Sequence, residues 1–264
     1  MPRALGPGES CPADSMTKHP GGKGANIAML ACSARDGVPG PSRIGVFLNG
    51  AVGADEPGSR LLEHLKRCGV DISRVRIMAG EATATGIVML KTVISDSRSF
   101  AYHGAISSWR MPDPSTVNCL TSGSIPDLIV ANLTAPQEEV VKVFTAAARE
   151  GETTVFNPSP IQEVDRVIFA NVTHLILNQS EAAALRQVDS GLLSDQSDWE
   201  ETTGFFLQLG VSNVVPTLAA EGAYYATIDG ESGHVKAVQG VQVVDATGAG
   251  DSFIGAYAVE YVRQ

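Results

Sequence analysis

Residues 127–156 read DLIVANLTAPQEEVVKVFTAAAREGETTVF, and this stretch decides the fold that the sequence predicts. The short apolar run 127–131 predicts a buried strand. Residues 137–150 place apolar side chains at helical spacing, and Gly151 follows them as a helix terminator. Residues 153–156 predict the next strand. A strand, a helix and a strand in this order indicate two parallel strands joined by a crossover helix.

The same alternation continues toward the end of the chain. Apolar runs at 174–177 and 213–217 predict two more strands, with helices over 179–187 and 198–209, so that a helix is expected between each pair of strands. Strands separated by helices form parallel sheets covered on both faces, which predicts an α/β fold. Ligands of such sheets bind beyond the carboxyl ends of the strands. Polar residues stand at those ends: Asn157, Asn178, Thr217 and Asp245.

The flanking segments complete the predicted architecture. A strand is expected over residues 43–48 and a helix over 57–68. Two hairpins are expected, one formed by 83–94 with 99–103 and the other by 222–228 with 234–238. A final helix is expected over 250–262. The long β-branched run in the first hairpin predicts strands that project from the sheet as a lid. We expect one domain over residues 1–264, with lid strands at about 83–103 plus part of the N-terminal segment.

The composition excludes several classes of protein. The formal net charge is −10, and because phosphate backbones bind basic faces we expect no nucleic-acid partner. No apolar run approaches the ~18 residues that span a bilayer, and the first ten residues lack the apolar core of a signal peptide. We therefore expect no membrane association and a cytoplasmic location. The four cysteines form no CxxC pair, which is typical of reduced thiols.

The segment Asp245-Ala-Thr-Gly-Ala-Gly-Asp-Ser-Phe253 carries the strongest chemical signal. It follows the extended stretch 241–244 and opens the final helix. Gly248 and Gly250 permit a tight turn with exposed N–H groups, and the helix N-terminus adds partial positive charge, which predicts an anion hole. Asp251 at this entrance can accept a proton from a hydroxyl that attacks phosphorus. Taken alone, Asp251 is better interpreted as an N-cap residue after a glycine turn. The two-glycine turn and the second carboxylate of the segment favour the functional interpretation.

A second glycine-rich segment, Gly21-Gly-Lys-Gly-Ala-Asn26, precedes the small-residue run 27–34. It is not a Walker A loop, because Thr17 stands where the first glycine is required, and it is not GxGxxG. Lys23 and Asn26 lie three residues apart in the first turn of a helix and share a face. The alternative interpretation is a glycine turn that leads into an Ala-rich core helix.

Together the two segments resemble the ribokinase family of carbohydrate kinases, which carries Gly-Gly-Lys-Gly-Ala-Asn early and Asp-Thr-Thr-Gly-Ala-Gly-Asp late. Three weaker matches lie between them in the family's order: residues 52–58 resemble its Gly-Asp-Asp-x-x-Gly turn, 157–160 its Asn-Pro-Ala-Pro segment and 178–181 its Asn-x-x-Glu motif. The resemblance covers nearly the whole chain. It implies a ribokinase-like three-layer sandwich with a small β lid, and an ATP-dependent kinase of ribose or a similar sugar. It also implies Mg²⁺ and K⁺ as cofactors and a homodimer formed through the lid.

The resemblance implies a role for each residue that matches a family motif. The base and anion hole would be formed by Asp251, Gly250, Ala249 and Gly248, and the sugar and transferring phosphate would be held by Gly22, Lys23, Asn26 and Asp251. The nucleotide would be bound by Asn178, Thr217 and Gly222. Glu181 would hold Mg²⁺ through water, and Asp245 and the carbonyl of Thr247 would hold the monovalent cation.

Some features depart from the family pattern. The chain begins after the family's first strand, whose Asp binds the sugar, and ends before helices that flank the adenine, so we expect a chain truncated at both ends with marginal turnover. Thr134 replaces a Glu that touches the sugar in ribokinases. The alternatives are a nucleoside or fructose kinase of the same fold and a non-catalytic nucleotide-binding member. A Rossmann dehydrogenase is excluded, because no predicted strand is followed by GxGxxG.

Overall fold

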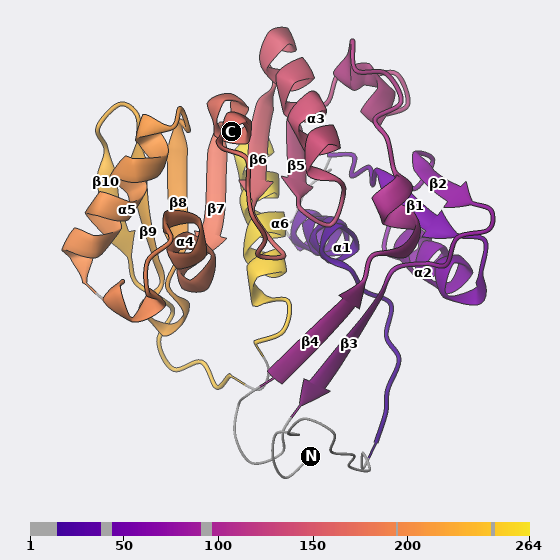
Figure 1. Ribbon diagram of the computed structural model, residues 1–264, viewed down its shortest axis with the longest axis horizontal. Helices are drawn as coiled ribbons and strands as arrows, with labels where there is room; N and C mark the ends of the chain where they lie inside the picture. The colour runs from indigo at the N-terminus through magenta and orange to yellow at the C-terminus, as the bar shows by residue number, and fades with distance from the viewer. Residues whose placement is uncertain (1–14, 38–43, 91–96, 194, 244–245) are drawn as a thin grey trace.

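The computed structural model describes residues 15–37, 44–90, 97–193, 195–243 and 246–264 (Figure 1). Within these residues the main sheet has the strand order β10-β9-β8-β7-β6-β5. Its strands are β5 (Leu128–Asn132), β6 (Thr153–Asn157), β7 (His174–Asn178), β8 (Asn213–Thr217), β9 (Ala223–Thr227) and β10 (Ser232–Val235). Strands β5 to β8 are parallel, while β9 and β10 extend the sheet in antiparallel fashion. The predicted mostly parallel sheet and its hairpin edge are confirmed.

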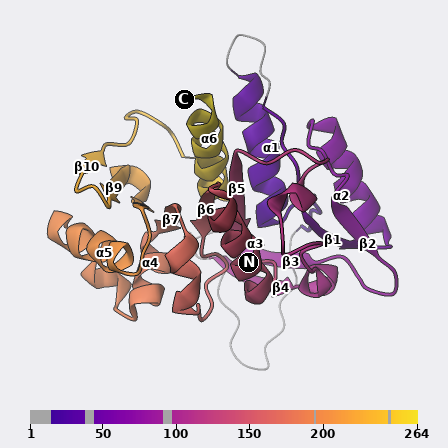
Figure 2. The same cartoon turned by 90° about the horizontal axis from the view of Figure 1, so that it is seen from above.

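Helices cover both faces of this sheet (Figure 2). One face packs against α3 (Gln137–Glu150), α4 (Gln179–Arg186) and α5 (Gln196–Gln208), and the other against α1 (Lys23–Asp36) and α6 (Ala249–Arg263). Alternate residues of a strand point to opposite faces. Accordingly Leu175 and Leu177 pack in the first core, and Ile176 packs in the second beside Ile27 and Ile254. This is the three-layer α/β sandwich expected from the sequence.

Helices α1 and α6 cross at very close range (Figure 2). A Cβ atom on Gly255 would lie 2.8 Å from the backbone nitrogen of Ala31 and 3.0 Å from the carbonyl oxygen of Ile27. Because those are backbone atoms, only a residue without a side chain fits at this crossing. The close approach brings the first turns of the two helices together at the carboxyl end of the parallel strands.

A smaller unit stands beside the sandwich. It contains β1 (Gly50–Gly53) and β2 (Val75–Met78), which are parallel, and α2 (Glu56–Arg67). The strand predicted over 43–48 is wrong for its described part: Phe47 makes one bridge to Asp71, and the strand lies at β1 instead. A Cβ on Gly53 would lie 2.3 Å from the carbonyl oxygen of Glu81, so this strand needs small residues where another segment crosses it. A search for apolar periodicity does not detect such a strand.

Two other predictions need correction. Strands β6 and β7 are joined by the 3₁₀ helix η3 (Arg166–Asn171) rather than by an α-helix. The segment between them begins with Pro158 and Pro160, which have no N–H to donate to a helix. Helix α5 begins at Gln196 because Asp195 caps it. The extended stretch expected over 241–244 runs into position 244, which lies outside the described residues. The remaining short helices are η1 (Gly104–Ser108), η2 (Val117–Leu120), η4 (Ser190–Leu192) and η5 (Ala219–Glu221).

The predicted lid hairpin is present as β3 (Thr85–Leu90) and β4 (Ser97–Tyr102), which pair antiparallel apart from the main sheet. It projects on the side where the parallel strands end (Figure 1). Asp55, which caps α2, also holds the base of this hairpin: its carboxylate accepts hydrogen bonds from the N–H and hydroxyl of Thr83 at 2.8 and 2.5 Å. These hydrogen bonds hold the pKa of Asp55 below its usual value. The segment 52–58 therefore anchors the hairpin to the smaller unit.

Candidate active site

The first turns of α1 and α6 meet around the carboxylate of Asp251. Asn26 donates a hydrogen bond from Nδ2 to Oδ2 of Asp251 at 2.8 Å, and the ammonium of Lys23 lies 3.9 Å from Oδ1. The side chain of Asp251 is 8% exposed and that of Lys23 is 34% exposed. Residues more than 220 positions apart in the sequence thus form one cluster, and it joins the two motifs singled out in the sequence.

Each of the two helices is preceded by a glycine with a positive φ, a backbone conformation that residues with a side chain rarely adopt. Gly22 precedes α1 with φ of 105°, and Gly248 precedes α6 with φ of 79°, and neither supplies a side-chain cap. Among the described residues, no acceptor takes the N–H of Gly250 or Asp251. The N–H of Ala249, in contrast, donates to the carbonyl of Ala246 at 3.1 Å. The anion hole implied at Ala249, Gly250 and Asp251 therefore has two available donors rather than three.

The electrostatics around the first turns of α1 and α6 favour the binding of a negatively charged group. The unpaired N–H groups and aligned peptide dipoles of a helix N-terminus attract anions, and two such termini lie together here. Lys23 adds a full positive charge beside Asp251. A transferring phosphoryl group carries negative charge on its oxygens, so this corner is suited to hold one next to a carboxylate that can act as a base.

A second polar group lies at the next strand ends. Asn178 caps α4 by accepting from the N–H of Glu181, and Glu181 Oε2 accepts from the N–H of Asn178, with both distances 2.9 Å. Asn157 donates to the same Oε2 at 3.3 Å and to the Ile176 carbonyl at 3.0 Å. The role of Asn157 in holding Glu181 could not be read from the sequence, which placed it only at a strand end. Among the described residues, Oε1 of Glu181 has no partner, so one carboxylate oxygen is available.

The implied nucleotide residues adjoin this group. Thr217 ends β8 in register with Asn178, and its hydroxyl donates to the Leu177 carbonyl at 3.4 Å. A Cβ on Gly222 would lie 2.0 Å from the carbonyl oxygen of Val235, so Gly222 is required by packing against β10. Thr247 precedes the turn at Gly248. Asp245, its expected partner in a cation site, lies outside the described residues.

Asn132 was not assigned a role from the sequence, yet the structure places it at the site. It is the last residue of β5, in register with Asn157 on β6. Its amide nitrogen lies 3.8 Å from the position of a Cβ on Gly24, in the same turn as Lys23 and Asn26. The signal that could have found it is its place at a strand end, which it shares with Asn157 and Asn178.

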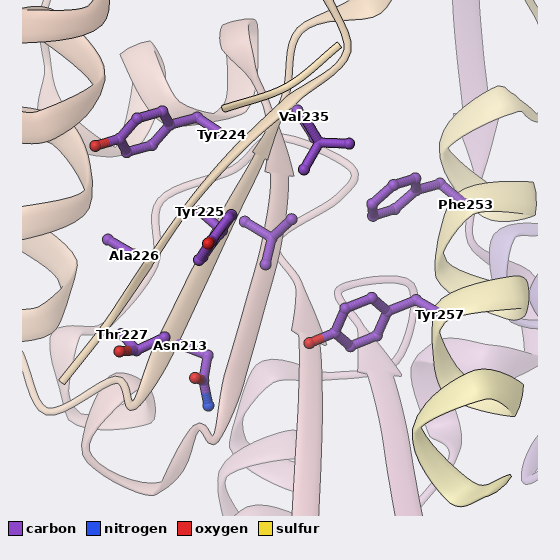
Figure 3. A pocket seen from close by; sticks show the side chains of 10 residues that line it. Asn213, Tyr224, Tyr225, Ala226, Thr227, Val235, Phe253 and Tyr257 are labelled. Carbon is purple, nitrogen blue, oxygen red and sulfur yellow. The ribbon is translucent and has the colours of Figure 1, made fainter. Parts of the chain in front are cut away.

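An apolar cavity of about 350 Å³ lies beside the site, between α6 and the face of β8, β9 and β10 (Figure 3). Phe253 and Tyr257 of α6 form one wall, and Val215, Ala223 and Val235 lie on the sheet side. Ala223 pairs with Thr217 and follows Gly222, so the cavity begins next to the implied nucleotide residues. The cavity does not contain Asp251.

The described residues contain no group of three or more His, Cys, Asp or Glu side chains placed to hold a metal ion. Glu181, buried with one oxygen available, suits a metal that keeps most of its water, as Mg²⁺ does. In the described part of the chain, none of the helices has the length and apolar character that crossing a membrane requires.

Comparison with known proteins finds relatives over nearly the whole chain. The sequence profile described as pfkB family carbohydrate kinase matches residues 3–264. Ribokinase of Schizosaccharomyces pombe is 30% identical over 248 residues, covering 93% of this chain and 74% of that protein. Ribokinase of Staphylococcus aureus is 27% identical over 252 residues, covering 95% of this chain and 78% of that protein.

Solved structures extend the likeness to the fold. The crystal structure of ribokinase from Thermotoga maritima has a TM-score of 0.81 at 25% identity, covering 99% of this chain and 80% of that one. The structure of Arabidopsis thaliana ribokinase complexed with ribose and ATP has a TM-score of 0.82 at 24% identity, covering 99% of this chain and 81% of that one. The three-layer fold is therefore shared over nearly the whole chain.

Proposed function

The chain belongs to the pfkB family of carbohydrate kinases, and on this premise we propose that it transfers the terminal phosphoryl group of ATP to a hydroxyl of ribose or a similar small sugar. The observation that carries the proposal is the contact of Asn26 and Lys23 with Asp251 at the first turns of two helices. Two curated relatives that match over most of this chain are ribokinases, which supports a ribose-like acceptor.

In the proposed reaction Asp251 is the general base. Its carboxylate accepts the proton of the sugar hydroxyl while that oxygen forms a bond to the γ-phosphorus, and ADP leaves with the electrons of the broken P–O bond. The N–H groups of Gly250 and Asp251 and the ammonium of Lys23 stabilise the charge on the transferring group. Asn26 orients the carboxylate through its 2.8 Å hydrogen bond and, with Gly22, lies where the sugar hydroxyls are expected.

We place the nucleotide along the ends of β7 and β8. Asn178, Thr217 and Gly222 adjoin the apolar cavity, whose walls of Phe253 and Val235 suit the flat face of a base. Glu181 would hold Mg²⁺ through water, and the ion would neutralise charge on the phosphates. For K⁺ we propose the Thr247 carbonyl and Asp245, by the resemblance of residues 245–251 to the family segment.

We further propose that the chain is one cytoplasmic domain that pairs through the β3–β4 hairpin. Ile87 of β3 and Tyr102 of β4 are large apolar side chains that are 59% and 61% exposed. Unpaired strand edges of this kind join with other chains. Light scattering at tens of micromolar should give the mass of a dimer for the wild type and of a monomer for Ile87→Lys; a monomeric wild type would end the pairing proposal.

The test of the function is a turnover assay with ATP, Mg²⁺ and K⁺ and a panel of ribose, fructose and nucleosides, in which ADP release and the phosphorylated product are both measured. We expect phosphorylation of ribose or a similar pentose. Preference for a nucleoside or for fructose would select one of the alternatives of the same fold. Nucleotide binding in thermal-shift measurements without product from any acceptor would identify a non-catalytic member and refute the proposal.

A further inference from the structure

Asn132 has an environment that differs from those of the neighbouring strand-end asparagines. Leu128 and Val130, which share its face of β5, pack in the core formed with α1 and α6. Asn132 therefore points toward the meeting of those two helices, and its Nδ2 reaches the turn that holds Gly24. Lys23 and Asn26, which contact Asp251, flank Gly24 in that turn. Asn132 thus borders the space in front of the proposed base.

The carbonyl oxygen of the Asn132 amide is fully engaged. Oδ1 accepts hydrogen bonds from the backbone N–H of Thr134 at 3.0 Å and from the Thr134 hydroxyl at 2.5 Å. Turning the amide by half a rotation would set its NH₂ group against the Thr134 N–H, which cannot accept a hydrogen bond. The backbone and side chain of Thr134 therefore fix which end of the amide faces the site.

The nitrogen of the same amide has no hydrogen-bond partner among the described residues. Asn132 is 7% exposed, and no acceptor among the described residues takes its two N–H hydrogens. Unlike the Nε2 atom of His174, this nitrogen is not sealed from solvent. A mostly buried donor that is held in one orientation, without a protein partner and open to the site, is a feature of ligand recognition.

We propose that Asn132 recognises the sugar by donating from Nδ2 to one of its oxygens, and that Thr134 is a positioning residue that holds this donor toward the site; this rests on the function proposed above. Asp251 and Oδ1 of Asn26 supply hydrogen-bond acceptors in the cluster that includes the Gly24 turn, whereas Asn132 supplies a donor beside that turn. Adjacent hydroxyl groups each donate and accept, so this alternation suits a sugar with neighbouring hydroxyls rather than an isolated alcohol.

The test compares Asn132→Ala, Asn132→Asp and Thr134→Val with Thr134→Ser and with the control Thr145→Val, an exposed threonine of α3. The KM for the sugar, the KM for ATP, kcat and the unfolding temperature are measured for each. Asn132→Asp keeps the acceptor for Thr134 and the shape of the side chain, so it tests the donor even where Asn132→Ala fails to fold.

We expect both Asn132 variants to raise the KM for the sugar roughly tenfold, the effect of one lost hydrogen bond, with the KM for ATP within about twofold of wild type. Thr134→Val should raise the KM for the sugar only about threefold, because the backbone N–H of residue 134 still binds the Asn132 amide. Thr134→Ser, which keeps the hydroxyl, should have the KM of the wild type. A deoxy sugar that lacks the recognised hydroxyl should no longer distinguish Asn132→Ala from wild type.

An active wild type whose Asn132 variants keep the normal sugar KM would overturn this inference alone. A parallel rise of both KM values with a lower unfolding temperature would assign Asn132 a structural role and also overturn it. A wild type that neither binds nor phosphorylates any sugar would overturn the proposed function, and this inference with it.

Discussion

Helix α6 contacts a charged group at its first turn and a buried, neutral group at its later turns. At its first turn the carboxylate of Asp251 meets Lys23 and Asn26 at a partly open corner. About two and three turns further on, Tyr257 and Tyr261 enclose His174. The Nδ1 atom of His174 is 2.8 Å from the Tyr257 hydroxyl, and its ring packs edge-on against both tyrosines. His174 begins β7, and Asn178, at the other end of that strand, belongs to the site.

The two ends of α6 differ in the surroundings that they give to the titratable groups Asp251 and His174. The N–H groups at a helix N-terminus, a lysine and an amide surround Asp251, and each of them is a hydrogen-bond donor or a positive charge. His174 is 5% exposed, its Nε2 has no partner among the described residues, and burial lowers its pKa from 6.5 to about 4. A buried group without a counter-charge stays neutral. One helix thus supports a reactive charge at its start and packs against a buried, neutral imidazole along its later turns.

The sharpest way to break this comparison is to remove the charge at the first end. Asp251→Asn keeps the size of the side chain but cannot accept the hydroxyl proton, so kcat should fall by ~10²–10⁴. The KM for ATP should change little, because the carboxylate acts on the acceptor. Asp229→Asn, in an exposed turn, is the control. An activity above about a tenth of wild type would show that Asp251 is not the base.

The surroundings of His174 can be tested by measuring stability as the pH is lowered. The folded protein holds His174 neutral, whereas the unfolded chain takes up a proton below pH 6.5, so the stability that this group contributes is present above pH 6.5 and is lost as the pH falls toward 4. Between pH 7 and 4.5 the loss should be roughly 2–3 kcal/mol. Urea unfolding of His174→Gln should lack this part of the pH dependence.

The exposed His234 provides the matched control for that measurement. His234→Gln should keep the acid-sensitive loss of the wild type. Equal slopes of stability against pH for wild type and His174→Gln would show that the buried imidazole is not the group that titrates.

The two ends are joined through the crossing at Gly255, and a third substitution tests that connection. A methyl group there meets backbone atoms of α1 at 2.8 and 3.0 Å, so Gly255→Ala should cost ~1–3 kcal/mol of overpacking, offset in part by the ~1 kcal/mol by which Ala favours a helix. Catalysis should also fall, since Asn26 and Asp251 move apart. Gly204→Ala in α5, where a Cβ meets nothing within 4 Å, should be neutral or stabilising.

A last substitution sharpens the account of the charged end. Lys23→Ala removes a partly exposed ammonium 3.9 Å from Asp251, and we expect kcat to fall and the KM for ATP to rise, each by roughly tenfold. Lys66→Ala, on the exposed face of α2, should leave both unchanged. A fall in kcat with no change in the KM for ATP would place Lys23 on the acceptor side alone.

Much of this protein follows from the sequence alone. Apolar runs of strand length separated by helical periodicity predicted β5, α3 and β6, because local pattern and burial agree there. The segments ending at Asn26 and Asp251 indicated the chemistry, since glycines before a helix start expose donors whatever the rest of the fold. The placement of β1 failed because its small residues are set by a segment that crosses it, which local pattern does not contain.

Only the tertiary structure decided which residues act together. No pattern in the sequence states that Asn26 donates to Asp251, because that contact depends on the glycine crossing of α1 and α6. The orientation of the Asn132 amide depends on Thr134 and the end of a strand, and the neutrality of His174 depends on aromatic rings brought by another element. Sequence periodicity records which face of an element is buried, whereas hydrogen bonds and desolvation depend on what packs against that face.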